Sequence, residues 1–250
     1  MFDHLVRNTL AEQGNQSSAP LPFCVCPKYR RNRTLVRKES ELRLNVERPQ
    51  TRIQKKNRQA ILEAALEVFS AEGFRGATLD KIAGVAGLSK PNVLYYFTSK
   101  EAIYTELLST LLDTWLDPLR ALKSDGEPIA EIVGYMRRKL QMSRQFPRES
   151  RLFANEIVQG APRILDQIEG PLKTLVDEKA ALIQAWIDAG QLADLDPHHL
   201  IFSIWSTTQH YADFDVQVQG ILAPDGGSHF GDADAFLTAM FTRALTPTER

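Results

Sequence analysis

The chain has 250 residues, with 30 Lys and Arg against 31 Asp and Glu, and 43% of its residues are apolar. This is the composition of an ordinary globular protein, and it excludes collagen-like and wholly disordered chains. The apolar runs fall short of the ~18 to 20 residues that a bilayer crossing needs, and the N-terminal residues lack a long apolar secretory core. We therefore expect a cytoplasmic protein without membrane contact.

The charges are distributed unevenly along the chain. Residues 1–100 carry 17 Lys and Arg against 9 Asp and Glu, whereas residues 101–250 carry 13 against 22. Local positive charge attracts phosphates whatever the overall isoelectric point. A basic N-terminal part on an acidic body therefore indicates a nucleic-acid partner, provided that a binding motif accompanies it.

Residues 1–50 show no sustained helical or strand period, and they contain four prolines and the basic segment KYRRNRTLVRK. We expect a mostly disordered basic extension. It is either a solvated tail, or sequence upstream of the natural start, or an arm that adds phosphate contacts, and an arm is the less favoured explanation. Cys24 and Cys26 have no clustered Cys or His partners, so we expect no metal site.

The pattern changes at Thr51, where the first of three helices is predicted. Thr51 and Gln54 have the spacing of a capping box, and apolar residues on one helical face follow them. Those residues are Ile61, Ala65, Val68 and Phe69. This helix should end at Gly73, because glycine is a common stop signal after a helix.

Two shorter helices follow, separated by a tight turn. Thr78 can cap the first of them, and Gly87 stops it. Ser89 can cap the next helix, which should run from Lys90 to Phe97. That helix has a proline early in it, where a missing N–H costs least.

Beyond Ser99 the chain alternates helical periods with Gly and Pro breaks, and no region shows the convincing alternation of a strand. We predict helices near 100–123, 127–145, 148–160, 164–189, 197–218 and 232–245. The fold class is therefore all-α, with a three-helix domain at 51–98 followed by a larger helical domain at 99–250.

Two short helices joined by a turn form the layout of a helix-turn-helix, whose second helix enters the major groove of DNA. The surrounding sequence reads GATLDKIAGVAGLSKPNVLYYFTSKEAIY. It resembles the DNA-binding domain of the TetR family of bacterial repressors, with a Gly-Leu-Ser turn, a short helix ending in aromatics and Phe, and Ser-Lys-Glu opening the next helix. The resemblance covers about residues 54–104 and implies that the protein binds double-stranded operator DNA.

Seven residues are candidates for DNA contact. Side chains in the first turn of the second helix can reach base edges, while nearby hydroxyls and a lysine at the next helix start suit phosphate oxygens. The seven are Thr78, Ser89, Lys90, Asn92, Tyr95, Tyr96 and Lys100. Leu94 stands where many relatives have a first tyrosine, which leaves the separate roles of the two tyrosines open.

One helical face near the C-terminus combines an indole with an amide. In the segment HLIFSIWSTTQHYADF, Trp205 and Gln209 lie one turn apart among apolar residues. Either Gln209 satisfies a neighbouring helix end and Trp205 is a core residue, or the two hold a ligand. On the residues alone the first explanation is favoured.

The body, including RLFANEIVQGAP at 151–162, resembles pyrimidine-responsive members of the TetR family. The resemblance implies that Trp205 stacks on uracil or thymine and that Gln209 reads the edge of the ring, since a Gln amide can match alternating C=O and N–H groups. It also implies that two chains pair through 197–218 and 232–245. Further candidates for the pocket wall are Trp115, Phe153 and Asn155.

We therefore predict a homodimeric repressor of pyrimidine-catabolism and nitrogen-metabolism genes that releases its operator when uracil or thymine binds. The alternative keeps the DNA-binding domain and assigns another effector, such as a purine, a drug or an acyl compound. An enzyme is disfavoured, because the chain has no glycine-rich phosphate loop, His-Glu-x-x-His motif or nucleophile elbow. His198 and His199 read as surface residues, and we expect no catalytic residue and no cofactor.

Overall fold

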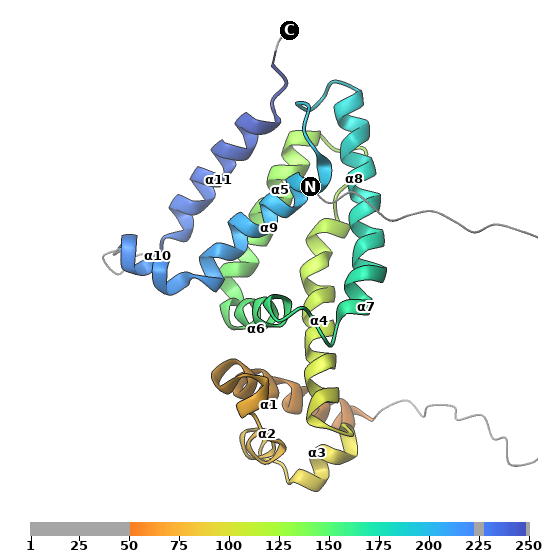
Figure 1. Ribbon diagram of the computed structural model, residues 1–250, viewed down its shortest axis with the longest axis vertical. Helices are drawn as coiled ribbons and strands as arrows, with labels where there is room; N and C mark the ends of the chain where they lie inside the picture. The colour runs from red at the N-terminus through yellow and green to blue at the C-terminus, as the bar shows by residue number, and fades with distance from the viewer. Residues whose placement is uncertain (1–50, 223–227, 249–250) are drawn as a thin grey trace, which may run out of the picture. The chain divides into compact units, whose positions relative to one another are not determined.

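The computed structural model describes residues 51–222 and 228–248, and all its regular structure within those ranges is helical (Figure 1). This confirms the predicted all-α class. The predicted basic extension at 1–50, with both cysteines, lies outside the described residues. In the described part of the chain, no helix is long and apolar enough to cross a bilayer.

Three helices form the N-terminal head, α1 (Arg52–Gly76), α2 (Leu79–Ala86) and α3 (Lys90–Tyr96). The predicted capping box is present, because the Thr51 N–H donates to Gln54 Oε1 at 2.8 Å and the Gln54 N–H donates to Thr51 Oγ1 at 3.2 Å. α1 continues past the predicted end at Gly73. That glycine nevertheless has a left-handed φ of 69°, so the regular part of the helix does stop there.

The turn between α2 and α3 has the geometry that its residue types predict. Gly87 adopts a left-handed φ of 66° and closes α2, since its N–H donates to the Ala83 and Gly84 carbonyls. The side chains of Thr78 and Ser89 accept hydrogen bonds from the first turns of α2 and α3. The structure thus confirms a helix-turn-helix.

The next helix, α4 (Lys100–Arg120), belongs to both halves of the described chain. Ile103 and Leu108 are fully buried in the core of the head, and Leu119 is fully buried in the core of the body. The expected domain boundary at residue 98 therefore lies just before a helix that the two cores share.

The body contains the remaining helices, and most bounds agree with the predictions to within a few residues. They are α5 (Pro128–Gln145), α6 (Pro147–Val158), α7 (Leu165–Gln167), the π-helical turn η1 (Ile168–Leu172), α8 (Lys173–Asp188), α9 (Pro197–Asp213), α10 (Asp215–Leu222) and α11 (Phe230–Leu245). α5 packs against both α9 and α11, and α8 packs against α9 (Figure 1).

Two predicted helices of the body are interrupted. The helix expected at 164–189 contains the π-helical turn around Pro171, whose missing N–H cannot continue the regular ladder. The prediction of a single helix at 197–218 is wrong, because the helix breaks at Phe214. The Arg151 guanidinium donates a hydrogen bond to the Ala212 carbonyl oxygen at 3.1 Å. In a continuous helix this oxygen would accept a backbone N–H from the next turn.

Candidate functional site

The first turn of α3 presents its polar side chains to solvent. Ser89, Lys90 and Asn92 are all exposed. Lys90 Nζ lies 2.9 Å from Asp80 Oδ2, but both side chains are well exposed, and such a pair is worth only ~0 to 1 kcal/mol. The Lys90 ammonium is therefore free to exchange this carboxylate for a phosphate.

The two tyrosines of α3 are positioned by amides from α1. Tyr95 Oη accepts a hydrogen bond from Gln54 Nε2 at 3.1 Å, and Tyr96 Oη accepts one from Asn57 Nδ2 at the same distance. A phenol that accepts from an amide keeps its own O–H to donate. Both hydroxyls can therefore donate to a phosphate oxygen.

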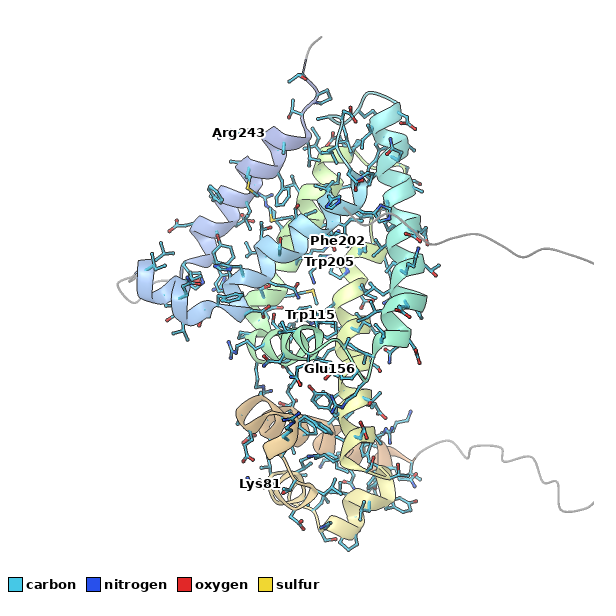
Figure 2. The ribbon with its side chains drawn as sticks, viewed as in Figure 1. Lys81, Trp115, Glu156, Phe202, Trp205 and Arg243 are labelled. Atoms are coloured by element: carbon cyan, nitrogen blue, oxygen red, sulfur yellow. The ribbon has the colours of Figure 1, made fainter. Side chains whose placement is uncertain are left out.

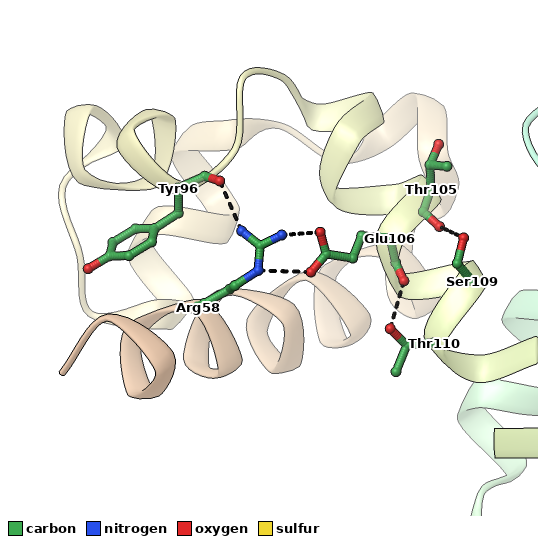
Figure 3. Close-up of polar contacts among 6 residues, drawn as sticks. All are labelled: Arg58, Tyr96, Thr105, Glu106, Ser109 and Thr110. Carbon is green, nitrogen blue, oxygen red and sulfur yellow. Dashed lines mark hydrogen bonds and ion pairs between the residues drawn. The ribbon is translucent and has the colours of Figure 1, made fainter. Parts of the chain in front are cut away.

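The C-terminal end of α3 is fixed by Arg58, a residue that the sequence pattern did not single out (Figure 3). Arg58 donates to the Tyr96 carbonyl at 3.1 Å and pairs with Glu106 of α4 through two nitrogens. Its guanidinium also lies 4.3 Å from the centre of the Phe97 ring. Arg58 thus holds α3 against α1 and α4, yet in the sequence it is one of several cations on a polar helix face.

Two of the residues predicted to contact DNA, Lys100 and Thr78, form hydrogen bonds within the head. Lys100 Nζ donates to the Phe74 and Ala77 carbonyls at 2.7 and 2.9 Å, and the Thr78 hydroxyl accepts the Lys81 N–H at 3.3 Å. The structure therefore gives both side chains a role in positioning the helix-turn-helix. Their contacts with DNA stay predictions.

The body contains a partly open cavity of about 340 Å³ between α4, α5, α6, η1 and α9. Its lining residues are Leu112, Trp115, Leu116, Lys139, Phe153, Ala154, Ile157, Val158, Ile168, Leu172, Trp205, Gln209 and Asp213. The cavity thus brings together Trp205 and Gln209 with two of the candidate wall residues, Trp115 and Phe153. Asn155 is exposed on α6 and does not line the cavity.

Trp205 and Gln209 differ in how their polar groups are used. The Trp205 indole N–H donates to the hydroxyl of the buried Tyr135, whose pKa is raised by burial. This bond fixes the indole and leaves its ring as the surface available to a ligand. Among the described residues the Gln209 side chain has no hydrogen-bond partner, so its amide can serve a ligand.

Two charged residues of the cavity wall were missed by the sequence interpretation. Lys139 of α5 is only 4% exposed, and its Nζ lies 4.5 Å from the centre of the Trp115 ring. Burial lowers the pKa of Lys139 to about 8, although attraction to Asp213 opposes this. Burial also raises the pKa of Asp213, which accepts the Ser150 hydroxyl. In the sequence, both residues resemble ordinary charges at the polar edge of a helix.

Arg163, in the segment after α6, connects α6 to the head. This guanidinium lies 3.0 Å from Glu156 Oε2 and 3.8 Å from the centre of the Phe74 ring in the head. The Glu156 carboxylate is fully buried and also accepts the Arg163 N–H at 3.0 Å. Figure 2 shows Trp205, Trp115 and Glu156 following one another from the body toward the head.

Comparison with known families divides the chain within α4. Residues 61–107 match the family model for bacterial regulatory proteins of the tetR family. Residues 108–248 match the model for the C-terminal region of YcdC-like protein. Together the two matches cover residues 61–248, which are the head from within α1 onward and the body.

Curated relatives are transcriptional regulators. The HTH-type transcriptional regulator RutR of Escherichia coli K12 is 53% identical over 164 residues, which are 66% of this chain and 77% of RutR. The HTH-type transcriptional regulator SrpR of Pseudomonas putida is 34% identical over 131 residues, which are 48% of this chain and 62% of SrpR.

Solved structures share the fold at low sequence identity. A transcriptional regulator from Streptomyces coelicolor has a TM-score of 0.62 at 23% identity, covering 76% of this chain and 98% of its own. The ketosteroid regulator KstR2 of Mycobacterium tuberculosis has a TM-score of 0.61 at 22% identity, covering 77% and 95%. At these identities the likeness concerns the fold alone.

The buried ammonium at the cavity predicts a stability effect. We expect Lys139→Met to raise the Tm of the ligand-free protein, because lowering the pKa from 10.5 to about 8 corresponds to roughly 3 kcal/mol against the charged folded state. Differential scanning fluorimetry at pH 7 should show an increase of several degrees. Lys56→Met, at an exposed position of α1, is the matched control.

The difference in stability between Lys139→Met and the wild type should depend on pH. The folded state releases the Lys139 proton near pH 8, whereas the unfolded chain holds it until about pH 10.5. The wild type therefore gains stability across this window, and its deficit relative to Lys139→Met should narrow as the pH rises. A lower Tm for Lys139→Met at pH 7 would contradict the expectation.

Proposed function

The chain is a member of the TetR family of bacterial transcriptional regulators. From this premise we propose that it is a homodimeric cytoplasmic repressor of pyrimidine-catabolism and nitrogen-metabolism genes. Binding of uracil or thymine releases this repressor from its operator. The observation that carries the effector assignment is the cavity beside Trp205 and Gln209. It offers a fixed indole face and an unused amide in otherwise mostly apolar surroundings. A flat ring with C=O and N–H groups at its edge fits that combination.

A dimer follows from the small size of one head. One helix-turn-helix reads few base pairs, so two recognition helices must meet successive major grooves about 34 Å apart. The expected pairing surface at the C-terminal end is apolar and exposed. Phe202 of α9, Val216 of α10 and Phe236 of α11 are 47%, 88% and 62% exposed. Apolar side chains that remain this accessible in one chain support pairing through these helices.

The affinity required of the pocket is modest. Uracil has eight non-hydrogen atoms, so a ceiling of about −1.5 kcal/mol per atom limits its binding free energy to roughly −12 kcal/mol. A micromolar effector needs only about −8 kcal/mol. A stacking face, a few hydrogen bonds and exclusion of water can supply that amount without a large contact surface.

The second candidate is another effector, such as a purine, a drug or an acyl compound, acting on the same DNA-binding head. The observation in its favour is the cavity itself, because most of its lining residues are apolar and its 340 Å³ falls within the range of sites for larger ligands. Such a ligand would depend on apolar contact along the whole cavity. A pyrimidine would depend on Trp205 and Gln209 in particular.

Two routes can carry the response from the cavity to the head. α4 contributes Leu112 and Trp115 to the cavity wall and continues into the core of the head. α6 also lines the cavity, and its Glu156 pairs with Arg163, whose guanidinium lies against the Phe74 ring. A shift of either element would change the separation of the two recognition helices in a dimer. A coupling of ~1 to 3 kcal/mol would lower operator affinity about 5- to 150-fold.

Lys90→Ala and Asn92→Ala should weaken binding to a duplex selected from a random library by the wild-type protein. Loss of a base contact by Asn92 should cost about 1 to 3 kcal/mol and relax sequence preference. Loss of a phosphate contact by Lys90 should reduce the slope of log affinity against log salt by ~1. Fluorescence anisotropy measures both effects, with Lys173→Ala on the body as the control. Duplex binding that ignores salt and both substitutions would overturn the DNA-reading role of α3.

Uracil and thymine should release the wild-type protein from that duplex in a titration. Trp205→Ala and Gln209→Ala should each raise the base concentration needed for release by tenfold or more, because both the stacking face and the amide contribute to affinity. His199→Ala, at an exposed position of the same helix, should leave the base concentration needed for release unchanged. If millimolar base fails to release the wild type, the effector is of another class. If only Trp205→Ala weakens release, the second candidate gains support.

Removal of the Glu156–Arg163 pair should weaken the response without abolishing either binding event. The double variant Glu156→Gln/Arg163→Gln is preferred, since removing the Arg163 charge alone would leave the buried Glu156 carboxylate without its ion pair at a cost of ~3 to 5 kcal/mol. We expect near wild-type affinity for duplex and for uracil, measured separately. The ratio of duplex affinities without and with uracil should fall several-fold. An unchanged ratio would show that this pair does not carry the response.

A further inference from the structure

Two charged side chains share the cavity with Trp205 and Gln209 and are not used by the proposed function as stated above. We propose that Lys139 and Asp213 read a lactam edge of the effector, with the Lys139 ammonium donating to a ring carbonyl oxygen and Asp213 accepting from the adjacent ring N–H. This assignment rests on the proposed function, because it requires a flat heterocycle in the cavity. It adds the two groups that recognise the polar edge of that heterocycle.

Lys139 lacks a hydrogen-bond acceptor in the part of the chain that the structure describes. The side chain is 4% exposed and lines the cavity, and its Nζ lies 4.5 Å from the centre of the Trp115 ring. A ring face attracts the positive charge but does not satisfy the three N–H donors of an ammonium. A buried ammonium in this position calls for an oxygen acceptor, and the cavity is where a ligand can supply one.

Asp213 provides the complementary acceptor. One carboxylate oxygen accepts a hydrogen bond from the Ser150 hydroxyl. The guanidinium of the neighbouring Arg151 donates its hydrogen bond to the Ala212 carbonyl instead. Within residues 51–222 and 228–248, no hydrogen bond occupies the second oxygen, and Asp213 forms no ion pair with Lys139. The carboxylate therefore retains a free lone pair at the cavity wall.

The helical register places the polar groups in one row. Trp205, Gln209 and Asp213 follow at intervals of four residues, so they occupy the same face of α9 on successive turns about 6 Å apart. Lys139 reaches the same cavity from α5, which packs along α9. A single flat ring can thus stack on the indole and meet an amide, a carboxylate and an ammonium at its edge.

The pairing of one cation with one anion also defines the class of ligand. A neutral ring with adjacent C=O and N–H groups satisfies both charges. A fatty acid carboxylate would bond Lys139 but face Asp213 with a like charge, and an organic cation would be repelled by Lys139. The two residues therefore favour uncharged lactams, including pyrimidine-diones, over the charged members of the second candidate class.

The test measures uracil affinity by isothermal titration calorimetry for the wild type, Lys139→Met and Asp213→Ala. Hydrogen bonds to charged groups are strong, so each substitution should weaken uracil binding about 10- to 150-fold. The controls are Lys56→Met and Asp166→Ala, which change exposed charges that do not line the cavity and should bind uracil as the wild type does. Thermal melting of every variant verifies that it folds.

Methylated bases separate contact from a purely structural effect. 1-Methyluracil and 3-methyluracil each lack one ring N–H, and at least one of them should bind the wild type tenfold or more weakly than uracil. That penalty should largely disappear in Asp213→Ala, because the acceptor for the missing N–H is already gone. A role in folding alone would leave the methylation penalty unchanged.

The outcomes distinguish this inference from the proposed function. If Lys139→Met and Asp213→Ala bind uracil within threefold of the wild type while Trp205→Ala does not, the lactam-edge assignment is overturned and the pyrimidine effector stands. The same holds if the methylation penalty is equal in Asp213→Ala and the wild type. If the wild type binds neither uracil nor thymine, the effector assignment itself fails.

Discussion

The arrangement of this protein depends on one helix being buried in two separate cores. α4 packs into the head through Ile103 and Leu108 and into the body through Leu119, and between these points Leu112 and Trp115 form part of the cavity wall. Packed cores resist compression, so a displacement of α4 at the cavity is transmitted along the helix rather than absorbed. The cavity is therefore placed where a small ligand can act on the position of α3.

The head and the cavity differ in how far their polar side chains are hydrogen-bonded within the described residues. In the head, Arg58 and Lys100 find carbonyls, a carboxylate or aromatic faces within the chain, and they hold the helix-turn-helix rigid. At the cavity, the described residues leave hydrogen-bonding capacity of Lys139 and Gln209 unused among apolar neighbours, which lowers stability. Such a departure from the pattern of a well-satisfied core is typical of a binding site. The rigid part suits a surface that must match DNA, and the unsatisfied part suits a space that must respond to a ligand.

The local features of the head could be predicted from the sequence because each depends on a few neighbouring residues. The Thr51 capping box, the left-handed Gly87 and the Ser89 cap follow from the hydrogen-bonding and conformational preferences of single side chains. The break at Phe214 could not be predicted, since Arg151 from another helix takes the carbonyl that would have continued α9. Of the suggested pocket walls, Trp115 and Phe153 line the cavity and Asn155 does not, a distinction that requires the rotation of α4 and α6 about their axes.

The sequence by itself determined the helical class, the helix-turn-helix with its exposed first turn, and the placing of Trp205 and Gln209 on one face of one helix. These properties depend on short-range periodicity and on the chemistry of caps and turns. Only the tertiary structure decided that Lys139 and Asp213 face the same cavity and that Arg163 joins the body to the head. Charged side chains on different helices carry no periodic signal that would bring them together, so their meeting is fixed by how the helices pack.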